Sequence, residues 1–447
     1  MTYDYQADEF TLDEAHNRLE LRGHAQLSSG GLQLRADSIT ADLKSGELTA
    51  SGGVSAAQEG RIMTGDQLVY NPRTGEGELT HAEFRARGAI VKAERIELFP
   101  DRIVATESLF TVCDLPHPHV GVRARRITVL SRPGAEGFIP TRATASGAKL
   151  FLYGLTTPRF PSYHISLTPE RSRKLPLPSA GYSRNDGLFA GGDVGLPSLP
   201  LDVRSSVRYR VTTRRGLRYV ARAERPAGWG SLELTYSRLE DLAEQNISGE
   251  QIDTGLANVF VNRRPEARAT LSERPLGRSF RLQIEAAAGN YSESPTGVTT
   301  SRQAGLLDVT WLGRPISRKL RLRGGAAVRR THYGTGSDST ITLGRIGVDA
   351  NLGVERTLGL TFVRRLQRGE TPFQWDRVEV ARALAADLAW RFDPRWRIEV
   401  RELYDLDRQR SRDIGITVGR TVHCLEWQLS WRQARRELSV GINLAPF

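Results

Sequence analysis

The chain has 447 residues and a formal net charge of +12, so it is long enough for two or three domains with sizeable cores. Hydrophobic residues make up 39%, and no run of about 18 apolar residues occurs, which excludes a helical membrane protein. A transmembrane β-barrel remains compatible with this composition, because half of each strand can be polar.

The start of the chain, Met1 to Asp4, shows no basic region followed by an apolar core, so no signal peptide is visible. An exported protein needs one, and the origin of an export signal is therefore left open.

Residues 1–130 repeat a short motif in which a small residue and a charged residue precede an apolar one. The motif occurs at residues 7–10, 36–39, 65–68, 93–96 and 124–127. A short alternating strand, a Gly-containing turn and a second strand follow each copy. Stacked hairpins of one fixed length share a continuous core. The repeats predict a β-jellyroll or open β-solenoid.

Residues 131–180 are rich in proline, which is confined to sheet edges and loops because it cannot donate to a ladder. Pro176 and Pro178 come last in this segment. One interpretation is a simple linker between domains. The other is a connection that ends in the first edge of a barrel, since residues 181–447 alternate as strands throughout.

From residue 181 onward, strands alternate an apolar face with a charged one. The pattern predicts an antiparallel transmembrane β-barrel of about 14 to 16 strands. A barrel of that size leaves an open lumen. The basic residues expected to face it are Arg204, Arg208, Arg210, Arg281, Arg397 and Arg401.

The last 25 residues form a predicted hairpin whose apolar face is rich in Trp. Its final strand presents Leu438, Val440, Ile442 and Leu444 on one face. These four positions are the expected edge of the last strand. Counting back from Phe447 in steps of two gives polar or small residues, so the apolar parity is shifted by one from the usual outer-membrane pattern.

The positive charge is concentrated in residues 166–447, which carry 45 basic and 31 acidic residues. Such asymmetry suggests an anionic partner, although Arg-rich codon usage on a solvated surface is the simpler explanation. Nucleic acid is not expected as a partner, because the aromatic residues lie on the face opposite to the arginines.

No catalytic residue, metal site or cofactor is expected. Phosphate-binding loops, nucleophile elbows and paired acids are missing from the sequence. Cys113, Asp114, His117 and His119 lie close together, but their spacing matches no zinc pattern. The chain therefore does not look like an enzyme.

Several stretches resemble the LptD/OstA family of outer-membrane lipopolysaccharide-assembly proteins. The repeats with "SGELTASGGV" are similar to the OstA-like periplasmic domain. "AKLFLYGLTTPRFPSYHISL" resembles the crossing into the barrel, and "RSRKLPLPSAGYSRNDGLFAGG" its first strands. "HCLEWQLSWRQARRELSVGINLAPF" resembles its last hairpin. Between about residues 200 and 410 only the alternation matches.

The resemblance implies a translocon in the bacterial outer membrane with its N-terminal domain in the periplasm. It would receive lipopolysaccharide or a related glycolipid from an OstA-like bridge protein. The lipid would leave sideways, through a gate between the first and last barrel strands, into the outer-membrane lipids. Prolines early in the family's barrels weaken this seam, which implies that Pro176 and Pro178 mark the gate edge together with the last-strand positions named above. Family members also tie the N-terminal domain to the barrel by a disulfide, which implies a bond between Cys113 and Cys424.

The family's barrels are considerably larger, so a plug lipoprotein like LptE is a doubtful partner here. The alternative function is a passive outer-membrane pore or structural barrel whose N-terminal domain binds a periplasmic partner. A soluble all-β glycan-binding protein is a third interpretation. The transported lipid and the oligomeric state are not determined by the sequence.

Overall fold

The computed structural model describes residues 4–29, 32–58, 61–86, 89–134, 137–157, 159–166, 179–199, 203–242, 259–294, 296–353 and 355–444. The chain divides into two compact units. The first comprises Met1–Lys174 with Leu444–Phe447, and the second comprises Leu175–Asn443. Each unit is described by itself.

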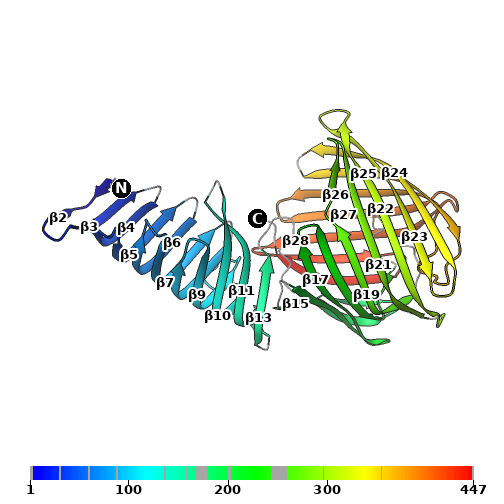
Figure 1. Cartoon of the computed structure of the whole chain (residues 1–447), viewed down its shortest axis with the longest axis horizontal. Helices are drawn as coiled ribbons and strands as arrows, with labels where there is room; N and C mark the ends of the chain where they lie inside the picture. Colours follow the sequence, from blue (N-terminus) through cyan, green and yellow to red (C-terminus); the bar gives the residue numbers. More distant parts are fainter. Residues whose placement is uncertain are drawn as a thin grey trace. The chain divides into compact units, whose positions relative to one another are not determined.

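The N-terminal unit is one antiparallel sheet in which most strands pair with the next strand along the chain (Figure 1). Its strands among the described residues are β1 (Asp4–Gln6), β2 (Glu9–Asp13), β3 (Arg18–Ser29), β4 (Leu32–Asp42), β5 (Leu48–Gln58), β6 (Arg61–Asn71), β7 (Glu76–Ala86), β8 (Ala89–Leu98), β9 (Arg102–Thr111), β10 (Val120–Gly134), β11 (Gly137–Leu152), β12 (Leu155–Thr156) and β13 (Phe160–Ser166).

The repeated motif marks the point where the neighbouring strand bulges. Asp37 on β4 lies under Gly52 on β5, whose φ is +79°. A Cβ built at Gly52 would sit 2.3 Å from the Asp37 carboxylate, so only glycine fits this bulge without a shift. In the next repeat, His81 of β7 has a φ of 44° and places its Nδ1 3.0 Å from the Asp66 carboxylate. The motif acid is therefore a partner for the bulge.

An apolar core runs the length of this unit. One row of directly paired, buried residues crosses the sheet from β3 to β11, and each pairs with the next: Leu21, Ile39, Ala50, Leu68, Leu79, Ile96, Ala105, Ile127 and Ala145. A row that unites nine strands explains why each repeat needs its neighbours. The predicted stacked-hairpin domain is confirmed.

Residues 131–166 continue the N-terminal sheet. β10 pairs with β11 through Gly134↔Gly137, and β11 pairs with β13 through Ala145↔Tyr163. Proline is accommodated here at a register shift beside Pro140, as expected of a residue that cannot donate to the ladder. The expected division at residue 130 thus lies within one sheet, and the boundary between the units falls at Lys174.

The second unit is a closed antiparallel barrel (Figure 1). β19 and β20 both pair with β21, so they act as one interrupted strand and the described barrel has 16 strand positions. The predicted barrel of about 14 to 16 strands is confirmed. The strands are β14 (Ser179–Ser183), β15 (Gly187–Leu199), β16 (Val203–Thr212), β17 (Gly216–Ala227), β18 (Gly230–Arg238), β19 (Phe260–Leu271), β20 (Arg274–Leu276), β21 (Phe280–Ser294), β22 (Thr299–Pro315), β23 (Leu320–Tyr333), β24 (Asp338–Gly353), β25 (Arg356–Gly369), β26 (Arg382–Asp393), β27 (Trp396–Asp405), β28 (Arg410–Val422), β29 (Leu425–Arg432) and β30 (Glu437–Leu444).

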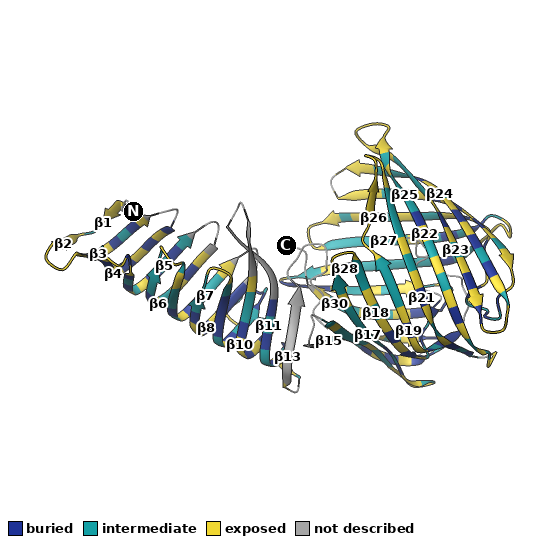
Figure 2. Ribbon diagram, in the orientation of Figure 1, coloured by how far each residue is buried: buried dark blue, intermediate teal, exposed yellow. Residues whose placement is uncertain are grey.

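The two faces of the barrel wall differ as the alternation requires. Along β18, Leu234 is 49% exposed, whereas its neighbour Thr235 is fully buried. Figure 2 shows this alternation of exposed with less exposed positions on most barrel strands. Exposed positions are often Leu, Val, Phe or Trp, and buried ones include many Arg, Asp and Glu. An apolar outer wall around a polar interior is the arrangement expected of a barrel in lipid.

Because the strands are antiparallel, the connections fall at two rims. The terminal rim is where β14 begins and β30 ends, and it carries the turns at residues 394–395 and 423–424. The loop rim is the opposite one, with the connections at residues 184–186, 370–381 and 433–436. Within the described residues, no helix has the length and apolar character needed to cross a membrane.

Candidate functional site

The first and last strands of the barrel meet along a short seam. β14 has five residues, and four residue pairs join it to β30, from Ser179↔Gly441 to Tyr182↔Leu438. By contrast, fourteen pairs join β24 to β25. A ladder with few pairs has few backbone hydrogen bonds to break, so among the described strands this seam is a low-cost place to part the wall.

The seam edge predicted from the sequence is partly described. Leu438 and Val440 lie on β30 with 48% and 43% of their surface exposed, and Ile442 is half-buried. Leu444 ends β30, but its side chain lies outside the described part, as do Pro176 and Pro178. The role of these residues as a gate edge stays a prediction.

Charged side chains span the seam near the loop rim. Arg210 on β16 lies with two guanidinium nitrogens 3.4 Å from the two carboxylate oxygens of Glu437 on β30. The same guanidinium donates to Asp186, between β14 and β15, at 3.1 Å. Asp186 and Glu437 are both buried. We call Asp186, Arg210 and Glu437 the seam clasp, because they connect β16 to β30 past the two strands between them.

Three of the other predicted basic residues have a carboxylate neighbour in the described structure. Arg208 contacts Asp193 at 3.0 Å, and Arg401 contacts Asp387 at 3.3 Å. Arg397 donates to Glu426 of β29 at 2.7 Å. No ion pair is described for Arg204 or Arg281. Arg204 lies on the same face of β16 as Arg208, and Arg281 on the same face of β21 as Glu285. Whether these arginines line a substrate path stays a prediction.

A loop closes part of the interior at the loop rim. The connection at residues 370–381 buries Phe373 completely, against Tyr291 of β21 and Tyr333 of β23. The backbone amide of Trp375 donates to Glu293 at 3.0 Å. These partners lie two to four strands from β25, so the loop folds inward across the interior.

Asp376 anchors this loop through a buried cluster of charged and polar side chains. Its carboxylate accepts from Arg302 at 2.9 Å and from the Tyr333 hydroxyl at 2.6 Å, and it also pairs with Arg329. Burial by itself would raise the pKa of Asp376, but the charges of Arg302 and Arg329 and these hydrogen bonds lower it to about 2. The aspartate is therefore ionised at any physiological pH.

A hollow of about 890 Å³ is bounded mainly by strands β23 to β29. Three ion pairs border it: Arg323–Asp349 at 3.0 Å, Arg401–Asp387 at 3.3 Å and Arg432–Asp413 at 2.9 Å. Paired charges of both signs can bind polar sugars and phosphates without creating a strong net field. The chemistry that this hollow offers is polar contact with a ligand.

Both cysteines are buried. Cys113 follows β9 and is 2% exposed, and Cys424 occupies the turn before β29 and is 5% exposed. That turn belongs to the terminal rim, where the chain enters and leaves the barrel.

Sequence reasoning missed the acidic partners and the loop. Nothing in the local sequence distinguishes these acidic partners from other acids beside turns; they are Asp186, Asp376 and Glu437. The signal that could have found the loop is its length combined with Phe373, Trp375 and Val380, since exposed barrel loops seldom need three large apolar residues.

Comparisons with known proteins support one family. Residues 4–102 match the model for the LptA/(LptD N-terminal domain) LPS transport protein. The LPS-assembly protein LptD of Cupriavidus metallidurans is 25% identical over 205 residues, which cover 44% of this chain and 24% of that protein. LptD of Ralstonia nicotianae is 26% identical over 300 residues, covering 63% of this chain and 34% of that protein. The chain thus spans about a quarter to a third of these relatives.

Solved structures add little. CdiB from Acinetobacter baumannii has 11% sequence identity and a TM-score of 0.38, covering 73% of this chain and 65% of its own. A mutant of the Rh. blastica porin has 10% identity and a TM-score of 0.31, covering 60% of this chain and 97% of its own. Both scores are too low to argue from. The matched repeats, the shared name of the curated relatives and the closed barrel show that this chain resembles the LptD/OstA family of outer-membrane lipopolysaccharide-assembly proteins.

Proposed function

We propose that this chain moves lipopolysaccharide, or a related glycolipid, to the outer leaflet of the outer membrane and releases it through the seam between β14 and β30. The observation that carries the proposal is the short seam itself. Four residue pairs hold it, against eight for β28–β29 and fourteen for β24–β25. A lipid that stays partly in hydrocarbon needs a lateral exit, and this short ladder has few backbone hydrogen bonds to break.

The two units suit the two parts of such a lipid. The N-terminal sheet offers a continuous apolar core for acyl chains. The barrel interior offers paired charges for a polar head, which would cost several kcal/mol to carry unsolvated through hydrocarbon. The N-terminal unit would lie in the periplasm.

The delivery partner would be a periplasmic bridge protein with the same kind of sheet. Strands β1 and β2 both pair with β3 at the start of the sheet, and Tyr5, Phe10 and Leu12 are exposed on them. An unpaired sheet edge with exposed apolar residues is suited to strand addition. A plug lipoprotein would have to share the interior with the loop at residues 370–381.

The disulfide between Cys113 and Cys424 belongs to the same proposal. Cys424 lies at the terminal rim, which receives the chain from the N-terminal unit, and both cysteines are buried. Closing so long a loop is worth about 5–6 kcal/mol in the chain-entropy estimate. Its functional effect would be to hold the N-terminal core at the mouth of the barrel.

A crosslink across the seam tests the proposal. Ala180 and Val440 are directly paired, so cysteines at both positions can close the seam on oxidation. The matched control places cysteines at Val207 and Ala221, which are directly paired between β16 and β17. Oxidation should abolish surface delivery of lipopolysaccharide for the seam pair only, with passive solute flux unchanged.

The alternative, a passive pore or structural barrel with a periplasmic partner, predicts a different result. Delivery would then be the same with the seam locked or free. That outcome would remove the lateral exit and leave the pore.

A further inference from the structure

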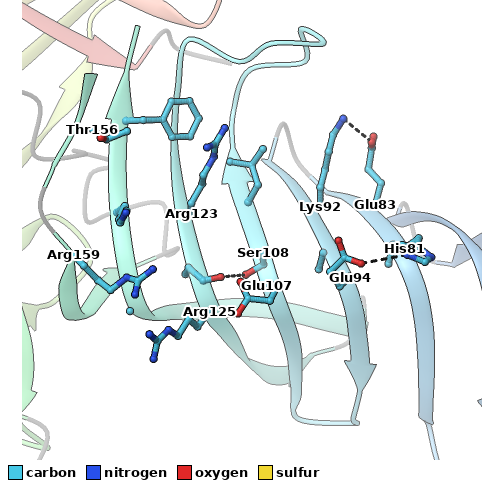
Figure 3. A pocket seen from close by; sticks show the side chains of 17 residues that line it. His81, Glu83, Lys92, Glu94, Glu107, Ser108, Arg123, Arg125, Thr156 and Arg159 are labelled. Carbon is cyan, nitrogen blue, oxygen red and sulfur yellow. Dashed lines mark hydrogen bonds and ion pairs between the residues drawn. The ribbon is translucent and has the colours of Figure 1, made fainter. Parts of the chain in front are cut away.

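The N-terminal sheet has a second feature, on the face opposite its apolar core. Arg123 and Arg125 of β10 and Lys149 of β11 are exposed, while Val122, Ala124 and Ala148 beside them are buried in the core. Together with Arg159, these basic residues line a pocket of about 620 Å³ (Figure 3). The pocket lies wholly within the N-terminal unit.

The far side of this pocket is already neutralised. Lys92 lies with its ammonium 3.2 Å from Glu83, and His81 lies 3.3 Å from Glu94. Figure 3 shows both contacts on the β7–β8 side, away from the arginines. These groups therefore have little charge left for a ligand.

The near side is different. Within the described part of the chain, Arg123, Arg125, Lys149 and Arg159 make no ion pair, and only Glu107 brings an acid near them. Four cations around one acid leave a net positive pocket. Burying or crowding like charges is unfavourable without a counter-charge, so this side is arranged for an anion.

The floor of the pocket is shaped as well as charged. The ring of Phe151 is 7% exposed and packs over Gly121, where a Cβ would lie 2.8 Å from the ring. The guanidinium of Arg123 lies 5.3 Å from the centroid of the same ring. This contact holds Arg123 in place over an apolar surface, which favours a compact anion carrying a small organic group.

We propose that Arg123, Arg125, Lys149 and Arg159 form a binding site for a phosphate-bearing ligand on the outer face of the N-terminal sheet. Arginine forks bind phosphate oxygens in pairs, and a lysine adds a point charge. The site goes beyond the proposed transport function, because it neither lies in the apolar core nor involves the barrel. The ligand's phosphate would come either from a lipid headgroup or from the free ion.

The experiment is calorimetric titration of the full chain in neutral detergent at low ionic strength. Inorganic phosphate probes the free ion, glycerol 3-phosphate probes the headgroup, and glycerol is the uncharged comparison. Both phosphates should bind and glycerol should not. The tighter of the two identifies the source. A double variant, Arg125→Gln with Lys149→Gln, should lose at least about tenfold in affinity, since charge-assisted contacts are removed.

Lys92→Gln is the matched control. It removes a cation from the same pocket, but the charge of that cation is already offset by Glu83, so the phosphate affinity of this variant should change less than about twofold. Raising the salt concentration should weaken binding to the unaltered chain, because the pocket is open to solvent. This second measurement does not depend on any variant folding. Absence of phosphate binding, equal losses for Lys92→Gln and the double variant, or salt-independent binding would each overturn the site.

Discussion

Replacing Glu437 by glutamine tests whether the seam clasp holds the first and last strands together. The substitution keeps the size of the side chain but removes the charge that faces Arg210. Both contacts between them are 3.4 Å, longer than an ideal charge-assisted hydrogen bond, so the loss should fall at the low end of the range for such bonds. We expect about 1–2 kcal/mol, which corresponds to a roughly fivefold to thirtyfold larger open fraction of the seam.

Amide hydrogen exchange measures this opening directly, because exchange of a protected amide reports the free energy of the local opening. Peptides from β14 and β30 should exchange roughly fivefold to thirtyfold faster in Glu437→Gln, while those from β24 and β25 keep their rates. Asp308→Asn is the matched control. Asp308 and Arg345 form a more deeply buried pair at 3.0 Å, away from the seam, so the control removes at least as strong an ion pair. If exchange rises everywhere, or not at all at β14 and β30, the clasp does not hold the seam.

Three other predictions follow from the same structure. Asp376→Asn should release the loop at residues 370–381 and raise single-channel conductance, because Arg302 and Arg329 lose their counter-charge. In the unaltered chain, the lowered pKa of Asp376 contributes about 2 kcal/mol of stability above pH 4, and this is lost only as the pH falls from about 4 toward 2. A conductance change of the unaltered chain near pH 6 would contradict this assignment. Gly52→Ala should lower the protease resistance of the N-terminal sheet more than Gly53→Ala, because both have positive φ but only Gly52 faces Asp37; equal losses would refute the repeat geometry. Mass spectrometry of the oxidised chain should find the Cys113–Cys424 peptide pair, and recovery of both thiols free would remove that bond.

The sequence predicted the kind of fold well because two periodicities are explicit in it. The motif spacing of the N-terminal repeats requires equal stacked hairpins, and the row from Leu21 to Ala145 is the core that this spacing implies. In the barrel, the two-residue alternation assigns each side chain to one of two faces. Neither inference needs to know which distant strands meet.

The interior could not be predicted in the same way, because it depends on contacts between residues far apart in the chain. Arg210 is separated from Glu437 by 227 positions, and Arg302 from Asp376 by 74. Each arginine looked like a free basic group in the sequence, and many of those the structure describes have a carboxylate partner. The inward fold of the loop depends on the closed barrel around Phe373, so the loop's own apolar residues are the only local sign of it.

The most direct test of lateral release is a photo-crosslinking residue placed at Leu438 during a short pulse of labelled lipopolysaccharide. Leu438 is 48% exposed beside the seam, and Leu234 of β18 is 49% exposed on the wall away from it, so the second position is the matched comparison. Newly delivered lipopolysaccharide should crosslink to position 438 first and reach position 234 only later, as it spreads through the leaflet. Equal labelling of both positions from the earliest time would contradict release through the seam.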